Sequence, residues 1–197
     1  MAIIVDKEQK RKDIAFACKD LLLEKGIKNI TISLIAKVAG IGKGTVYEYF
    51  ENKEDIVFEI MTAFIAEYEE KLIQIVSKNI SIKEKLFHFL YKSFEDDDSL
   101  KQLALYREFL AIVMTNGTDE MIEFNIDCRK RFELLLVDIL KEGVNNNEVP
   151  SKILTLESMI LTFAIGLIIE VQTIKLNPKK EIEKFVDTLF DLITTKE

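Results

Sequence analysis

The stretch from Thr31 to Phe50, TISLIAKVAGIGKGTVYEYF, constrains the fold of this chain more than any other. It holds two short helical patterns separated by residues 39–42, Ala-Gly-Ile-Gly. Two helices joined by so short a turn cross steeply, which requires a small residue at the crossing and a glycine that can adopt a positive φ. Ala36 and Gly40 stand at those places, and Thr31 or Ser33 can cap the first helix. The pattern predicts a helix-turn-helix.

The second of these helices has an inner and an outer side. Val46 is expected to be buried against Ile32 and Ile35, which leaves a set of polar and aromatic side chains facing outward: Lys43, Thr45, Tyr47, Glu48 and Tyr49. Such a helix can enter a DNA major groove, where side chains read base edges while hydroxyl and ammonium groups bind phosphates. A tight helical hairpin with exposed tyrosines is the alternative at this point.

Helical periodicity extends along the whole chain, without a sustained alternation of apolar and polar residues that would predict a sheet. The expected fold class is therefore all-α, with about nine helices. Clusters of cap and turn residues separate the later helices at residues 79–81, 96–99, 116–118, 145–151 and 177–178. The first helix is expected to end near Lys25, before Gly26. Near Asn52 we expect the junction between a DNA-binding domain, residues 1–52, and a larger domain, residues 53–197.

Charge is distributed unevenly along the 197 residues. The net charge is −7, which alone argues against a nucleic-acid partner. Residues 1–50, however, carry nine lysines and arginines against six aspartates and glutamates, a net +3 that leaves −10 for the remainder. A basic first quarter attached to an acidic remainder is expected when one part of a protein contacts a polyanion.

Nothing in the sequence indicates catalytic or metal chemistry. Cys18 and Cys128 stand far apart on apolar patterns, so they are expected in the core rather than in a zinc site or a disulfide. The lone His88 lies between two phenylalanines, where a packed histidine is expected. The carboxylates at residues 95–98 are expected to form a solvated helix end, because a Ca²⁺ loop spaces its ligands around a glycine. We expect no cofactor, no metal and no enzyme activity.

No export or membrane anchoring is expected. The longest uncharged apolar run, Ser158 to Ile169, is well below the ~20 residues of a membrane span. The apolar start, Ile3 to Val5, is too short for a secretory signal. We therefore expect a cytoplasmic protein without a membrane partner.

Several features of the first 60 residues coincide with one family pattern. They are the Ala17, Cys18, Leu21, Leu22 and Gly26 arrangement, the pairs Ile35-Ala36 and Ala39-Gly40, the run Gly44-Thr45-Val46-Tyr47 followed by Tyr49-Phe50, and Lys53-Glu54. From about Lys10 to Ile60 the chain resembles the DNA-binding domain of the TetR (tetracycline-repressor-like) family of bacterial transcriptional regulators. Gly42 departs from the pattern, since the family usually has serine or another polar residue there.

The resemblance implies DNA contacts from Thr45, Tyr47, Tyr49 and Lys53, with Thr31 and Ser33 reaching phosphate. The full set of candidate DNA-binding residues is Thr31, Ser33, Lys43, Gly44, Thr45, Tyr47, Glu48, Tyr49 and Lys53. Tyr47 and Lys53 are expected to be exposed in the free protein. Glu48 could accept a hydrogen bond from a cytosine amino group or could simply be solvated, and both alternatives stay open.

The last two helices carry apolar residues on more sides than one neighbouring helix would cover. The segment Ile153 to Val171 is apolar nearly all round, and the next helix carries an apolar stripe at three- and four-residue steps. The stripe can pack on its own chain, whereas the TetR resemblance implies a four-helix interface between two subunits, the alternative we favour. The candidate dimer residues are Ala164, Gly166, Ile182, Phe185, Val186, Leu189, Phe190 and Ile193.

Ten of the 13 phenylalanines lie beyond residue 60. Aromatic residues are ordinary core material, but the family's effector pocket suggests a small apolar or aromatic ligand among them. The candidate lining residues are Tyr91, Phe94, Tyr106, Phe109, Met114, Phe124, Phe132 and Phe163.

Two functional hypotheses follow. The first is a homodimeric, ligand-responsive regulator, in particular a repressor, that a small effector releases from a palindromic double-stranded DNA operator. The second is an all-helical small-molecule carrier or interaction module whose helix-turn-helix is vestigial. DNA binding distinguishes the two.

Overall fold

The computed structural model describes residues 6–194, so the Ile3 to Val5 stretch lies outside the described residues. Within that range all regular structure is helical, which confirms the all-α class. The α-helices are α1 (Lys7–Ala17), α2 (Lys19–Lys25), α3 (Ile32–Ala39), α4 (Lys43–Tyr49), α5 (Lys53–Val76), α6 (Ile82–Tyr91), α7 (Asp97–Asn116), α8 (Asp119–Asn145), α9 (Glu157–Thr173) and α10 (Pro178–Thr194). Short 3₁₀ helices are η1 (Ile27–Asn29), η2 (Lys92–Phe94) and η3 (Ser151–Thr155).

The first expected helix is divided at Cys18, which accounts for one more helix than the sequence predicts. Cys18 is fully buried, and its backbone N–H bonds to the carbonyl of Ala15 three residues back, at 3.0 Å. Its thiol lies 3.9 Å from the carbonyl oxygen of Ile35 in α3. The expectation of a buried, small apolar residue holds for Cys18, but its position breaks the helix because the chain turns there toward α3.

The chain divides into two compact units. Unit 1 comprises residues 1–66 and 104–121, and unit 2 comprises residues 67–103 and 122–197. The division falls inside α5, inside α7 and just after the start of α8, so each of these helices contributes to both units. Unit 1 therefore contains the expected DNA-binding domain, residues 1–52, together with parts of three further helices. The functional boundary at residue 52 stays a prediction.

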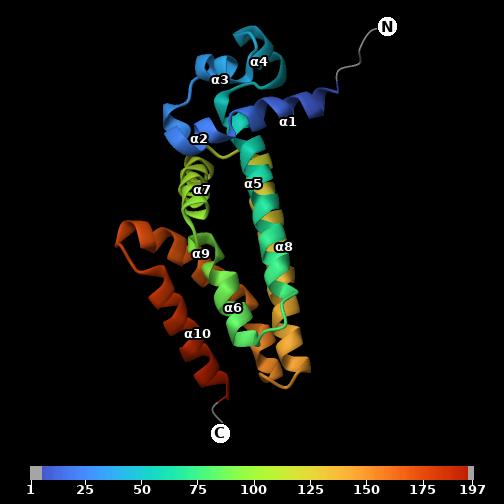
Figure 1. The fold of residues 1–197 in the computed structure, drawn as a ribbon, viewed down its shortest axis with the longest axis vertical. Coiled ribbons are helices and arrows are strands. Elements are labelled where there is room, and N and C mark those ends of the chain that lie inside the picture. The colour runs from blue at the N-terminus through green and yellow to red at the C-terminus, as the bar shows by residue number, and fades with distance from the viewer. Residues whose placement is uncertain (1–5, 195–197) are drawn as a thin grey trace. The chain divides into compact units, whose positions relative to one another are not determined.

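Unit 1 is built on α1, α3 and α4, which contact one another, as Figure 1 shows at the blue end of the chain. Its core contains Leu22, Ile35, Val46 and Phe50, all of which are almost fully buried. We call residues 6–52 the head. Burying these apolar side chains at about 25 cal/mol per Å² is the main force that holds so small a group of short helices together.

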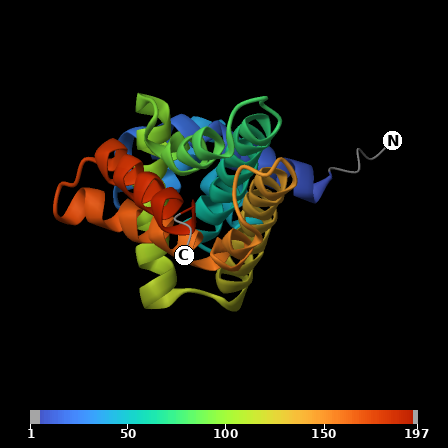
Figure 2. The same cartoon turned by 90° about the horizontal axis from the view of Figure 1, so that it is seen from below.

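Unit 2 has its core where α6, α8 and α9 supply buried leucines and isoleucines, and α10 lies alongside α6 (Figures 1 and 2). Lys85 of α6 is only 2% exposed. Its Nζ lies 2.6 Å from Oε2 of Glu142 and donates to the carbonyl oxygen of Val76 at 2.7 Å. The ammonium group thus joins three helices, which offsets the cost of removing it from water.

None of the helices in residues 6–194 is both long enough and apolar enough to cross a membrane.

Candidate nucleic-acid interface

The helix-turn-helix predicted between Thr31 and Phe50 is present as α3 and α4. Thr31 caps α3, since its hydroxyl oxygen accepts a hydrogen bond from the backbone N–H of Leu34 at 3.3 Å. Gly40 ends α3 with a φ of 67°, a left-handed conformation that favours glycine. Val46 and Ile35 are both fully buried, and α3 contacts α4. The inner side of α4 therefore packs as the sequence predicts.

The outer side of α4 faces solvent. Lys43, Gly44 and Glu48 are exposed, and Tyr47 exposes 58% of its surface. Thr45 and Tyr49 are half-buried. An ammonium group, a phenol and a carboxylate thus stand on one accessible surface. Together they offer donors to phosphate oxygens and both donors and acceptors to base edges.

The start of α3 adds two hydroxyl groups. Thr31 and Ser33 are both exposed. The hydroxyl oxygen of Thr31 accepts the capping bond described above, and its O–H remains a donor. Gly42, the cap residue of α4, supplies no side-chain hydrogen bond, so the contact that a serine could make is absent here.

Lys53 departs from expectation. The sequence predicts an exposed side chain, but Lys53 is half-buried, and its Nζ donates to the backbone carbonyl of Ile27 at 3.4 Å. This hydrogen bond is long and therefore weak. A phosphate contact from Lys53 would compete with it.

The surface of the head carries positive charge that ion pairs do not neutralise. Within the described part of the head, six exposed lysines make no ion pair: Lys7, Lys12, Lys25, Lys28, Lys37 and Lys43. Unpaired lysines retain their full attraction for phosphates and release counterions when they bind DNA. The local charge therefore suits a polyanion despite the net charge of −7.

Arg11 fixes the position of α4, a role that no sequence pattern indicates. Its Nη1 donates to the backbone carbonyl of Tyr49 at 2.6 Å, and its guanidinium lies 4.6 Å from the centre of the Phe50 ring. Nε of Arg11 also lies 3.5 Å from Oε2 of Glu59 in α5. The sequence shows only that the first helix carries a positive charge here. The partners of Arg11 lie about 40 to 50 residues away along the chain, so a local pattern does not indicate them.

The candidate effector residues fall in both units. In unit 1, Tyr106 and Phe109 have ring centres 6.5 Å apart, whereas Met114 is 76% exposed. In unit 2, Tyr91 and Phe94 have ring centres 6.5 Å apart. The remaining candidates in unit 2, Phe124, Phe132 and Phe163, are half-buried. The structure thus places Tyr106 near Phe109 and Tyr91 near Phe94, and it leaves Met114 in solvent.

Tyr68 adds a polar group to the aromatic residues of unit 2. Its hydroxyl accepts a hydrogen bond from Ser93 Oγ at 2.9 Å, and its ring meets that of Phe132 edge-on, with 5.7 Å between centres. Burial raises the pKa of Tyr68 to about 12. Nearby along α8, Arg131 Nη1 donates to Glu69 Oε2 at 2.9 Å. Tyr68 was not among the candidate residues, because no sequence pattern indicates that Ser93 and Phe132 lie beside it.

The apolar stripe of α10 is divided between two environments, which corrects the expectation that all of it is available to a partner. Ile182, Val186 and Ile193 are buried within unit 2. Their surface is therefore already covered by their own chain. Phe185, Leu189 and Phe190 are half-buried, as are Ala164 and Gly166 of α9.

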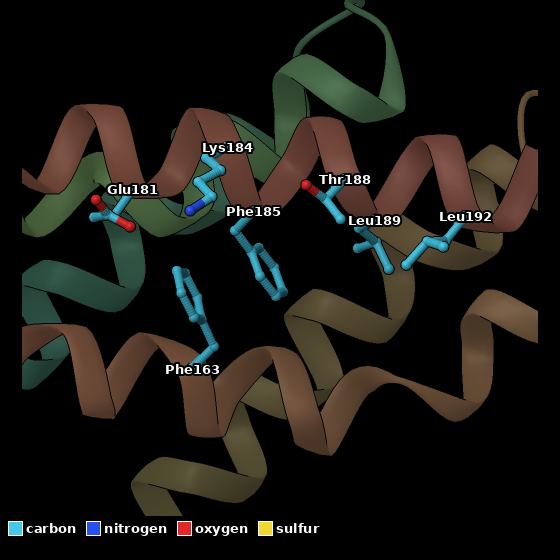
Figure 3. A pocket seen from close by; sticks show the side chains of 7 residues that line it. All are labelled: Phe163, Glu181, Lys184, Phe185, Thr188, Leu189 and Leu192. Atoms are coloured by element: carbon cyan, nitrogen blue, oxygen red, sulfur yellow. The ribbon is translucent and has the colours of Figure 1, made fainter.

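A groove of about 320 Å³ lies between α9 and α10 (Figure 3). Its lining residues are Phe163, Glu181, Lys184, Phe185, Thr188, Leu189 and Leu192. The rings of Phe163 and Phe185 stack with 3.9 Å between centres and 7° between planes. Figure 3 shows the charged side chains of Glu181 and Lys184 beyond one end of this stack and the two leucines beyond the other.

Further apolar side chains beside the groove are exposed. We define the outer face as Met159, Ile165, Ile169 and Leu192, which expose between 40% and 69% of their surface. A Cβ atom placed on Gly166 would meet nothing within 4 Å. Exposed apolar side chains of this kind often mark a protein interface.

Comparisons with known proteins agree with this geometry. Residues 17–60 match the family model described as bacterial regulatory proteins, tetR family. The chain is 27% identical over 150 residues to the fatty acid metabolism regulator protein of Bacillus subtilis, covering 73% of this chain and 72% of that protein. It is 26% identical over 148 residues to the HTH-type transcriptional repressor KstR2 of Rhodococcus jostii, covering 75% and 71%. Both relatives are regulators and not enzymes, in agreement with the expectation for this chain.

A solved structure shows the same fold. The transcriptional regulator FadR from Bacillus subtilis, in complex with stearoyl-CoA, superposes with a TM-score of 0.61 at 23% identity. The alignment covers 94% of this chain and 98% of that chain.

Proposed function

We propose that this chain is a repressor of the TetR family of bacterial transcriptional regulators and that it leaves a palindromic operator when an effector with an apolar chain binds. The outer side of α4 carries this proposal, because Lys43, Tyr47 and Glu48 stand exposed on a helix whose inner side is packed. A recognition helix needs that combination of rigid support and free polar side chains. Such a protein would act in the cytoplasm.

The proposed division of labour on DNA follows side-chain chemistry. Thr31, Ser33, Lys43 and Lys53 would bind phosphates, which sets the position of the head. Tyr47 would lie in the major groove, with Gly44 allowing close approach and Thr45 and Tyr49 at the edges of the contact. Glu48 would either accept a hydrogen bond from a cytosine amino group or remain solvated.

A dimer supplies the second head. One short recognition helix gives little specific affinity, whereas two related by twofold symmetry can read half-sites about 34 to 36 Å apart or a multiple of that distance. We propose that the outer face, together with Phe185, Leu189, Ala164 and Gly166, packs against the same surface of a second copy. A twofold interface requires one self-complementary surface, and two apolar faces satisfy this condition.

The effector proposed here is a long-chain acyl-CoA. Two comparisons support it: the similarity to a fatty acid metabolism regulator and the shared fold with a regulator solved with stearoyl-CoA. The acyl chain would contact the packed aromatic rings of Phe58, Tyr106 and Phe109 in unit 1.

A gel-shift experiment tests the proposal. The purified protein is titrated onto the DNA upstream of its own coding region, with and without stearoyl-CoA, and onto a scrambled fragment of equal length as a control. We expect retardation of the upstream fragment alone and its reversal by stearoyl-CoA but not by coenzyme A. Binding of stearoyl-CoA without any DNA binding would favour the carrier hypothesis.

A further inference from the structure

The side chain of Glu108 in α7 holds the turn that follows α2. Its Oε2 accepts a hydrogen bond from the backbone N–H of Ile27, the first residue of η1, at 2.8 Å. Hydrogen bonds to a carboxylate are roughly twice as strong as those between neutral groups. Both residues belong to unit 1. A helix that starts in unit 2 is thus tied directly to the head.

Gly26 leaves room for this carboxylate. Its φ is +71°, and a Cβ atom placed on it would lie 2.6 Å from Oε1 of Glu108 and 3.2 Å from Oε2. Any larger residue at position 26 would have to displace the carboxylate. The glycine that the sequence marks as a helix stop therefore has a second role, which is to allow the close approach of Glu108.

The other polar group of Ile27 is held by a different helix. Its carbonyl accepts the hydrogen bond from Lys53 Nζ at the start of α5, and its side chain is 2% exposed. The two helices that hold Ile27, α5 and α7, each contribute to both units. Any change in the position of α7 relative to α5 would therefore act on this turn.

Glu108 also lies next to candidate effector residues. Phe109 is fully buried, with its ring 6.4 Å from that of Phe58 in α5 and 6.5 Å from that of Tyr106. Packed interiors shift between discrete arrangements rather than deforming smoothly. A ligand that displaces these rings would therefore move the backbone that carries Glu108.

We propose that Glu108 is a positioning residue through which α7 fixes the head in its DNA-binding position. Effector binding lengthens or breaks the hydrogen bond from Ile27 to Glu108, which frees the head and lowers DNA affinity. This inference rests on the proposed function and names the contact through which its regulation acts. By linkage, DNA binding strengthens the same contact and weakens effector binding by an equal factor.

The test compares the parent with Glu108→Ala and Glu108→Gln. Glu123→Ala is the matched control, because Glu123 is exposed and has no partner within the described residues. Amide exchange at Ile27 is followed by NMR, and affinity for the upstream DNA is measured with and without stearoyl-CoA. In Glu108→Ala we expect exchange at Ile27 to be roughly 10- to 100-fold faster. Its DNA affinity should fall several-fold, and stearoyl-CoA should lower it further by less than in the parent.

The conservative variant separates positioning from folding. Glu108→Gln keeps an acceptor oxygen of the same reach, so it should recover most of the parental exchange rate and effector response. Unchanged exchange at Ile27 in Glu108→Ala, or an effector response equal to that of the parent, would overturn the proposal. If the parent binds DNA but ignores stearoyl-CoA, equal basal DNA affinities of the parent and Glu108→Ala would overturn it. A parent that binds no upstream DNA contradicts the proposed function itself, and the regulatory role of Glu108 fails with it.

Discussion

Arg11 donates a hydrogen bond to the last residue of α4, the backbone carbonyl of Tyr49, at 2.6 Å. The same guanidinium covers the ring of Phe50 and reaches Glu59. The end of the proposed recognition helix is thus fixed by a side chain from the first helix of the head. Arg11 is half-buried, so its effect on DNA binding can be indirect.

Replacing Arg11 should weaken DNA binding by loosening α4. We expect Arg11→Ala to lower the free energy of unfolding by roughly 1–3 kcal/mol, the range for hydrogen bonds that involve a charged group. Arg11→Lys should recover little, because an ammonium group lacks the planar fork that binds two partners at once. Urea unfolding and DNA titration measure both effects. Lys12→Ala, which removes an exposed charge from the same helix, should leave stability within about 0.5 kcal/mol of the parent.

Lys43 and Tyr47 should affect DNA binding in different ways. Lys43→Ala removes one phosphate contact per subunit, so the salt dependence of a dimer's DNA affinity should flatten by about two units. Tyr47→Ala should lower affinity with little change in that slope, because no charge is lost. Fluorescence anisotropy at several salt concentrations measures both quantities. If both variants bind DNA as the parent does while retaining its circular dichroism, the recognition helix is misassigned.

A charge on the outer face should separate the subunits without unfolding them. Leu192 is 69% exposed in one chain, so Leu192→Lys should leave the monomer folded. In a dimer the same lysine would be buried without a partner, at a cost of several kcal/mol, which weakens dimerisation by at least roughly 100-fold. Sedimentation and gel shift should change together. Leu134→Lys on α8, where the leucine is 65% exposed, is the control.

Position 26 should tolerate alanine less well than position 40. Both glycines have positive φ, but Gly40 has a left-handed ψ of 30°, which costs alanine about 1–2 kcal/mol, whereas Gly26 has a ψ of 166°, in a region that essentially only glycine adopts. Only Gly26 faces Glu108, since a Cβ on Gly40 meets nothing within 4 Å. Gly26→Ala should therefore lower the free energy of unfolding more than Gly40→Ala does. In a Glu108→Ala background the difference should become smaller, because the clash with the carboxylate is removed while the backbone strain at position 26 remains. An unchanged difference would show that the clash with Glu108 contributes nothing.

Alkaline pH should destabilise unit 2 through Tyr68. Its pKa is raised from 10.0 to about 12 by burial, so the folded protein holds the proton more tightly than the unfolded chain. The stabilisation is complete below pH 10 and is lost as the pH rises through 12, by roughly 2–3 kcal/mol. Urea unfolding at pH 9 and pH 11 measures the first half of this loss, about 1.4 kcal/mol. Tyr68→Phe cannot titrate, so its stability should fall less over the same interval than that of the parent.

Local patterns were enough to predict the helix-turn-helix and the all-α class. Gly40 and Thr31 act through their own backbone neighbours, so their roles at the end and start of α3 could be read directly from the sequence. The roles of Arg11 and Glu108 depend on partners 38 and 81 residues away, and a single sequence does not indicate such pairs. The break at Cys18 has the same origin in long-range packing.

The stripe on α10 shows a second limit of periodicity. Spacing of three and four residues identified the apolar side of the helix but not what covers it. Ile182 and Val186 turned out to be covered by their own chain, whereas Phe185 and Leu189 line the groove. A helix between two neighbours needs an apolar surface on more than one side, and a stripe does not show where one neighbour ends and the next begins.

The ion pair between Lys85 and Glu142 also determines the order in which mutations can accumulate. Lys85 is 2% exposed, whereas the side chain of Glu142 is 40% exposed. If Glu142 is lost first, a buried ammonium group keeps only the carbonyl of Val76, and such broken pairs cost about 3–5 kcal/mol. If Lys85 first becomes an apolar residue of similar volume, Glu142 can turn to water at little cost. Substitutions that remove this pair are therefore expected to change Lys85 first, because losing Glu142 first destabilises the fold.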